Sequence, residues 1–164
     1  MKKLISLLAI GLTGCGDVEP IYLGGEQSRY IGTWFHEDIR SSSNNIAIKR
    51  VYLDIRLDSS ADYSSCFVSK TWKNGSSSTS SSSNSVQLPN ALITQLIEDT
   101  ITLTMDVAIF SFDYDIDVTA PPYQVDDQWY IDIDKTTLKK LTRSEANALN
   151  EVTCPDSEQL QQNG

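Results

Sequence analysis

Alternating apolar and polar positions run through much of the chain and predict β-strands. Every second residue is apolar from residue 51 to residue 57 and again from residue 129 to residue 133. Successive side chains of a strand point to opposite faces, so this pattern buries one face and leaves the other in water. The apolar positions are Val51, Leu53, Ile55, Leu57, Trp129, Ile131 and Ile133.

The longest alternating segment, residues 101–118, changes phase near its middle. Its apolar residues stand at odd positions as far as Ile109 and at even positions from Phe110 onwards. One straight strand cannot keep a single apolar face through such a change. We therefore expect the chain to bulge or turn near Ile109 and Phe110.

Two short segments have features of helices. Residues 90–99 carry four apolar residues at helical spacing, namely Leu92, Ile93, Leu96 and Ile97. Further on, Thr142 and Glu145 have the spacing of a capping box, and Ala146 and Leu149 are expected to face the core. We expect a short helix in each segment.

The strand-rich pattern predicts an all-β fold, a small antiparallel β-barrel with a short C-terminal helix. Closure into a barrel removes exposed strand edges, and a sandwich or another small barrel is the alternative. A serine-rich run within this domain cannot bury apolar surface and is expected to form a long loop. The expected organisation is a signal peptide (1–14), a flexible tether (15–28), the barrel domain (29–154) with a serine-rich loop (74–85), and a disordered tail (155–164).

The N-terminus has the layout of an export signal. Basic residues precede an apolar run, 4–12, that is too short to span a bilayer as a permanent helix. The tetrapeptide Leu12-Thr13-Gly14-Cys15 resembles the lipobox of bacterial lipoproteins, in which the signal is cut before the cysteine. A plain signal peptide with an incidental cysteine is the alternative.

The lipobox resemblance implies that Cys15 is acylated and anchors the protein. Several acyl chains at about 0.8 kcal/mol per buried CH₂ hold a protein on a membrane without a transmembrane helix. In many Gram-negative lipoproteins an aspartate directly after the cysteine retains the protein in the inner membrane, and Gly16 occupies that position here. The resemblance therefore implies the cell envelope, at the outer membrane and facing the periplasm.

Export also bears on charge and on the other cysteines. Removal of Lys2 and Lys3 leaves eleven of the thirteen basic residues against twenty-two acidic ones, a net charge of −11. Such a protein does not attract nucleic acid, which requires a basic patch. With Cys15 lipidated, Cys66 and Cys154 form an even pair and are expected to form one disulfide; two free buried thiols are the alternative.

The first predicted strand contains Gly32-Thr33-Trp34, which resembles the G-x-W signature of lipocalin-like barrels. In that family the tryptophan closes one end of the barrel beneath an arginine that follows the last strand. The resemblance implies these barrel-closing roles for Trp34 and Arg143, with a cation–π contact worth about 0.5–2 kcal/mol. Many lipocalins also tie a barrel strand to the C-terminal segment by a disulfide.

The sequence offers little for catalysis, and we expect no enzyme activity, no cofactor and no metal site. His36 is the only histidine, shares the strand face of Trp34, and is expected to be structural. Several aspartates resemble a calcium loop, but Val118 stands where an EF-hand needs glycine. We expect an acidic patch on a wet strand face, formed by Asp113, Asp115, Asp117, Asp132 and Asp134.

These features leave two candidate functions. The first is a lipid-anchored barrel that binds a small apolar molecule, as lipocalin-like folds often do. The alternative is a protein-interaction module of the envelope, such as an inhibitor, an immunity protein or an assembly factor, which uses the acidic surface or the serine-rich loop. The fold by itself does not choose between them, because one fold serves many functions.

Overall fold

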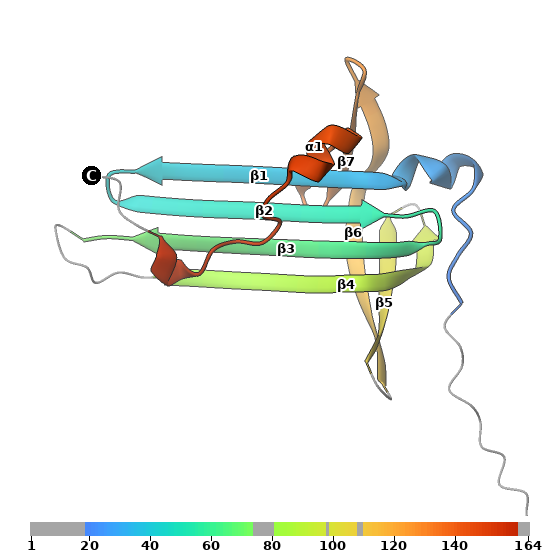
Figure 1. Cartoon of the computed structure of the whole chain (residues 1–164), viewed down its shortest axis with the longest axis horizontal. Coiled ribbons are helices and arrows are strands. Elements are labelled where there is room, and N and C mark those ends of the chain that lie inside the picture. The colour runs from blue at the N-terminus through green and yellow to red at the C-terminus, as the bar shows by residue number, and fades with distance from the viewer. Residues whose placement is uncertain (1–18, 74–80, 98, 108–109, 161–164) are drawn as a thin grey trace, which may run out of the picture.

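A computed structural model describes residues 19–73, 81–97, 99–107 and 110–160. In this part of the chain eight antiparallel strands follow one another in sequence order and close into a barrel, which confirms the predicted fold class. Figure 1 shows β1–β4 side by side, with β5 and β6 running across them. The elements are η1 (Gly25–Tyr30), β1 (Gly32–Ser42), β2 (Asn45–Ile55), β3 (Ser60–Thr71), β4 (Ser81–Ile97), β5 (Thr100–Val107), β6 (Phe110–Val125), β7 (Gln128–Ile133), β8 (Thr136–Lys140), α1 (Arg143–Ala148) and η2 (Ser157–Gln159).

The barrel closes where β1 meets β8. Trp34 pairs with Lys140 and Phe35 pairs with Lys139. The Nδ1 of His36 donates to the carbonyl oxygen of Thr137 at 3.0 Å, directly beyond this short ladder. His36 thus contributes to closing the barrel, in keeping with a structural histidine.

The interior of the barrel is filled with apolar side chains from every strand. They form one contiguous cluster, and many of its members have no exposed surface. Burial of this kind stabilises a Leu, Ile or Val side chain by about 1.5–3 kcal/mol. Fully buried members include Trp34, Leu53, Ile93, Leu103, Ile116, Ile131 and Leu138.

The phase change in segment 101–118 marks a turn between two strands. β5 ends at Val107 and β6 begins at Phe110, and these two residues are partners in an antiparallel ladder. The odd positions of β5 and the even positions of β6 therefore share one face, because the turn reverses the chain. The chain therefore reverses direction between Val107 and Phe110, in agreement with the turn expected near Ile109 and Phe110, although Ile109 itself lies outside the described residues.

The helix expected at residues 90–99 is wrong, because these residues belong to β4, which ends at Ile97. Ala91 and Ile93 are fully buried, and the register between β4 and β5 shifts between Ile93 and Gln95. Such a bulge adds one residue to the strand and moves the next apolar side chains out of strict alternation. The resulting spacing resembles that of a helix.

The C-terminal helix is present as α1, which begins directly after Thr142. Thr142 and Glu145 form the predicted capping box, each side chain bonding the backbone of the other residue. Ala146 and Leu149 are only half-buried, so they do not reach the core as expected. No helix in the described residues is long and apolar enough to cross a membrane.

The segments expected to be loose are partly attached to the barrel. In the expected loop 74–85, residues 74–80 lie outside the described residues, whereas β4 begins at Ser81. In the expected tether, Leu23 is buried and the N–H of Ile21 bonds the carbonyl of Ile93. In the expected tail, Leu160 is buried against β2 and β3. Cys15 and the signal peptide lie outside the described residues.

Candidate functional site

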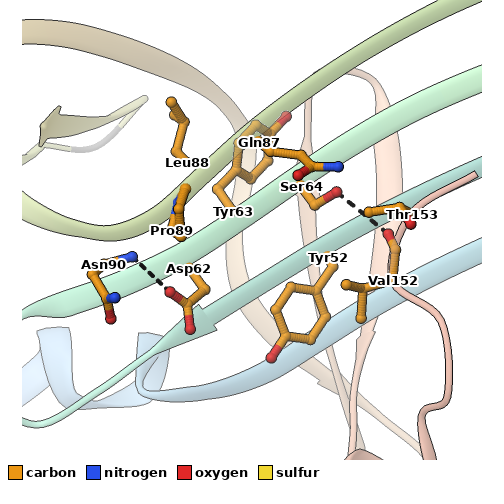
Figure 2. A pocket seen from close by; sticks show the side chains of 10 residues that line it. All are labelled: Tyr52, Asp62, Tyr63, Ser64, Gln87, Leu88, Pro89, Asn90, Val152 and Thr153. Atoms are coloured by element: carbon orange, nitrogen blue, oxygen red, sulfur yellow. Dashed lines mark hydrogen bonds between the residues drawn. The ribbon is translucent and has the colours of Figure 1, made fainter.

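A groove of about 420 Å³ lies on the outside of the barrel, where the C-terminal segment crosses β2, β3 and β4. Figure 2 shows its lining, which combines apolar and aromatic side chains with a few amides, hydroxyls and one carboxylate. The lining residues are Tyr52, Asp62, Tyr63, Ser64, Gln87, Leu88, Pro89, Asn90, Val152 and Thr153. The volume falls in the range of roughly 300–1,000 Å³ that is typical of ligand sites.

A β-bulge forms one end of the groove. Between Ala61 and Tyr63 the register of β3 and β4 shifts, so that Pro89 and Asn90 together face Asp62. Proline has no N–H to contribute to a ladder and is tolerated at such a bulge. Asn90 has a left-handed backbone conformation with φ of 52°, which asparagine adopts more readily than most residues.

Asp62 holds this bulge in place. Its Oδ1 accepts the backbone N–H of Asn90 at 2.7 Å, and its Oδ2 pairs with Arg56. The carboxylate is therefore committed to the fold and offers little to a ligand. The half-exposed Tyr52 stands near it, and burial, followed by the charges of Asp54 and Asp62, raises the pKa of the Tyr52 phenol.

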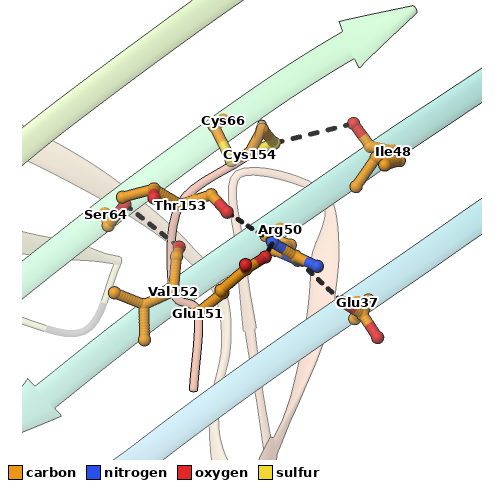
Figure 3. Close-up of a disulfide and its surroundings, with 9 residues drawn as sticks. All are labelled: Glu37, Ile48, Arg50, Ser64, Cys66, Glu151, Val152, Thr153 and Cys154. Atoms are coloured by element: carbon orange, nitrogen blue, oxygen red, sulfur yellow. Dashed lines mark hydrogen bonds and ion pairs between the residues drawn. A yellow bond between two sulfur atoms is a disulfide. The ribbon is translucent and has the colours of Figure 1, made fainter. Parts of the chain in front are cut away.

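The C-terminal segment forms the opposite wall and is tied to β3 by the disulfide between Cys66 and Cys154, with 5.8 Å between their Cα atoms. We call residues 151–160 the strap. Its attachment also includes the Ser64 hydroxyl, which donates to the carbonyl of Val152 at 3.3 Å. Figure 3 shows the two contacts side by side on β3. The wall of the groove is thus covalently fixed.

Arg50 on β2 clamps the strap to the barrel from the other side. Its side chain is largely buried and donates to Glu37 at 2.7 Å, to Glu151 at 3.0 Å and to the carbonyl of Thr153 (Figure 3). Burial lowers the pKa of the Arg50 guanidinium, but the hydrogen bonds that it donates to Glu37 and Glu151, together with their charges, outweigh this effect, and the net direction is upward. Arg50 therefore stays charged and links β1, β2 and the strap.

Tyr63 connects the groove with the barrel interior. It is almost fully buried, its ring lies 5.6 Å from that of Tyr114, and its hydroxyl donates to Asp134 at 3.2 Å. Burial, and then the charge of Asp134, raises the pKa of the Tyr63 phenol. Tyr63 is thus a neutral hydrogen-bond donor that supports the structure.

The barrel end at Trp34 differs from the expectation in one residue. The cation above the indole ring is Lys140, with its Nζ 5.0 Å from the ring centroid. Arg143 is instead the first residue of α1 and is exposed. β8 ends at Lys140, so the chain has left the barrel wall before it reaches Arg143.

Three of the five predicted acidic residues lie in a row on the outer face of β6. They stand opposite threonines of β5: Thr104 donates to Asp113 at 2.6 Å and Thr102 donates to Asp115 at 2.8 Å. The third, Asp117, is exposed beside them. This is the wet strand face that the alternation predicts.

The other two acidic residues serve the fold. Asp132 accepts the hydroxyl of Tyr123 at 3.3 Å, and Asp134 accepts Tyr63 at the end of the barrel. In the described part of the chain no group of three or more His, Cys, Asp or Glu side chains is arranged to hold a metal ion. The five carboxylates therefore provide surface charge and structural acceptors.

The groove was not predicted from the sequence, because its residues come from segments far apart in the chain. The local signal available was the Pro89-Asn90 pair, which is unusual within a strand. Only the pairing with Asp62 turns this pair into a bulge that lines a groove. Comparison of the chain with protein-family models, with curated proteins and with solved structures finds no match.

Proposed function

We propose that this chain is a non-catalytic lipoprotein of the cell envelope that binds another protein through the outside of its barrel. The observation that carries the proposal is the filled interior, which leaves the inside of the barrel to its own side chains. The groove, in contrast, is open to solvent and walled by a strap that a disulfide and Arg50 fix in place. A rigid site of this kind loses little conformational freedom on binding.

The chemistry of the groove suits a short apolar segment of a partner. Tyr52, Pro89 and Val152 offer apolar contact, and the amides of Gln87 and Asn90 offer hydrogen bonds to a peptide backbone. Tyrosine and proline are efficient contact residues because few of their torsions must be fixed on binding. The acidic row on β6 adds a surface that favours a partner with basic residues.

The anchor and location belong to the same proposal. Its support is the tetrapeptide ending in Cys15, followed by Gly16, which implies an outer-membrane lipoprotein that faces the periplasm. Its barrel is similar to a lipocalin in having a tryptophan at one end of the barrel with a cation stacked on it. The lack of catalysis is supported by His36, which bonds Thr137, and by the structural roles of Asp62 and Tyr63.

A photo-crosslinking residue at Gln87 in the full chain tests the proposal in cells. We expect a discrete crosslinked protein from position 87 and none from Arg40, an exposed residue of β1 outside both the groove and the acidic row. The variant Val152→Arg, which places a charge in the groove wall, should remove the crosslink without releasing the protein from the membrane. Crosslinks of equal strength from both positions, or from neither, contradict the proposal.

A small apolar molecule is the second candidate, favoured by the volume of the groove. Native mass spectrometry of the disulfide-bonded protein distinguishes it from a protein partner. A discrete small adduct that Val152→Arg abolishes would support the small molecule. A bare mass together with the crosslink from position 87 would support the protein partner.

A further inference from the structure

β5 and β6 continue beyond the barrel as a ribbon of two strands. β4 pairs with β5 only as far as Thr104, and β7 pairs with β6 only from Val118. The β5–β6 ladder itself continues to the pair of Val107 and Phe110. An isolated two-stranded ribbon is only marginally stable in water, so this part of the chain gains from a surface that covers it.

One face of this ribbon is apolar and exposed. Val107 is 52%, Phe110 72% and Phe112 44% exposed. With Met105 opposite Phe112, they form what we call the apolar ribbon face. The other face is polar, because the Ser111 hydroxyl there donates to Asp106. Large apolar side chains that gather on a surface mark a contact with another molecule or with a membrane.

The N-terminal segment runs toward the same end of the molecule. The 3-10 helix η1 lies beside Leu96 and Ile97 at the end of β4, whereas Ile21 bonds Ile93 further back along that strand. From η1 back toward Cys15, the N-terminal segment therefore runs from Ile97 toward Ile93. Because β4 and β5 are antiparallel, β5 runs in the same direction toward the ribbon. Figure 1 shows the described N-terminal segment and the ribbon pointing to the same side of the barrel.

The chain between Cys15 and the barrel is short enough to bring the two together. Ile21 is held on β4, so five residues separate it from Cys15, and the six steps from one Cα to the next reach at most about 20 Å. Ile93 pairs with Leu103, and Val107 lies four residues beyond it, about 13 Å along β5. A membrane surface that holds Cys15 therefore lies within reach of the ribbon.

We propose that the apolar ribbon face rests on the surface of the membrane in which Cys15 is anchored. The proposal rests on the lipid anchor of the proposed function and adds a second point of contact, which sets the orientation of the barrel. One lipid-modified residue combined with an amphipathic element holds a protein more firmly than either does. The carboxylate of Asp106 makes a zwitterionic surface more favourable than an anionic one.

Tryptophan quenching in vesicles tests this contact. The full, lipidated chain is placed in phosphatidylcholine vesicles that contain a brominated phosphatidylcholine, and Phe110→Trp is compared with Val125→Trp. Phe110 is the first residue of β6 and Val125 is the last, and both side chains are exposed. The two variants therefore place a tryptophan at opposite ends of the same strand. The parent chain supplies the signal of Trp34, Trp72 and Trp129 for subtraction.

We expect brominated lipid to quench the tryptophan at position 110 and to leave the one at position 125 unchanged. Replacement of much of the phosphatidylcholine by an anionic lipid should weaken that quenching. Vesicle flotation of the parent and of Cys15→Ser separates the two proposals: if the parent does not float, the anchor and the ribbon contact both fail. If the parent floats and position 110 is not quenched, or both positions are quenched equally, only the ribbon contact fails.

Discussion

Lys140 lies above the ring of Trp34, with its Nζ 5.0 Å from the ring centroid. Trp34 donates its indole N–H to the carbonyl of Tyr30 at 2.7 Å, and Lys140 donates to the carbonyl of Arg29 at 3.2 Å. Both residues therefore bind the segment that covers this end of the barrel. The last strand, the first strand and η1 meet at these two side chains.

We predict that Lys140→Met destabilises the protein by about 1 kcal/mol, because it removes the cation from the ring of Trp34. Arg143→Met is the matched control, since Arg143 is exposed on α1, and it should change stability by less than about 0.5 kcal/mol. Urea unfolding followed by tryptophan fluorescence measures both. A larger loss of unfolding free energy from Arg143→Met than from Lys140→Met would show that Arg143, as the sequence resemblance implied, is the cation that stabilises Trp34.

We predict that replacement of Gly32 by alanine destabilises the protein. Its φ is +131°, and an added Cβ would lie 2.6 Å from the Cε of Lys140. We expect Gly32→Ala to lose more than about 1 kcal/mol of unfolding free energy. Combination with Lys140→Ala removes the close contact but not the backbone strain, so the double variant should lose less than the sum of the two single variants. Strict additivity would refute the contact.

The disulfide is predicted to contribute much of the stability of the strap. Cys66 and Cys154 are 88 residues apart, and a loop of that length corresponds to about 4.6 kcal/mol in the chain-entropy account. Chemical unfolding of Cys66→Ser combined with Cys154→Ser should show a loss of this order. Glu151→Gln removes one exposed partner of Arg50 and should cost under about 1 kcal/mol. Equal losses in the two proteins would contradict the dominance of the disulfide.

The capping box predicts how the free energy of unfolding depends on pH. Hydrogen bonds from Lys139 and then from the backbone and hydroxyl of Thr142 lower the pKa of Glu145 from 4.5 to about 2. The unfolded chain therefore binds a proton at this position at higher pH than the folded chain does. The contribution of Glu145 is complete above pH 4.5 and is lost as the pH falls through about 2.

Measurement of unfolding free energy against pH checks this prediction. Glu145→Gln should show a flatter dependence than the parent between pH 4.5 and 2. Lys139→Met removes one donor and should produce part of the same change. Parallel curves for the three proteins would show that the carboxylate of Glu145 keeps its unfolded pKa in the folded protein.

Local sequence signals were sufficient where the structure follows local rules. Strand alternation placed His36 on the face of Trp34 and Asp115 on the wet face of β6, and the Thr142 and Glu145 pair marked the start of α1. The antiparallel barrel and the C-terminal helix followed from the local pattern, whereas the number of strands was not predicted, because part of β4 was taken for a helix.

Local sequence signals could not predict the features that depend on the register between strands. The bulge beyond Ile93 gave residues 90–99 a helical spacing, and the end of β8 placed Lys140 rather than Arg143 above Trp34. Each outcome is decided by hydrogen bonds to a neighbouring strand, which no local window contains. The groove has the same origin, since Asp62 and Asn90 meet only across the β3–β4 ladder.

The short ladder between β1 and β8 also sets the order in which the described barrel can assemble. Its other ladders join strands adjacent in sequence, whereas this one unites Trp34 with Lys140, across nearly the whole domain. Contacts between distant residues carry the largest loop-closure entropy and tend to form late in folding. The seam at Trp34 should therefore close last and open first, and its amide protons should exchange with solvent sooner than those of the β2–β3 ladder.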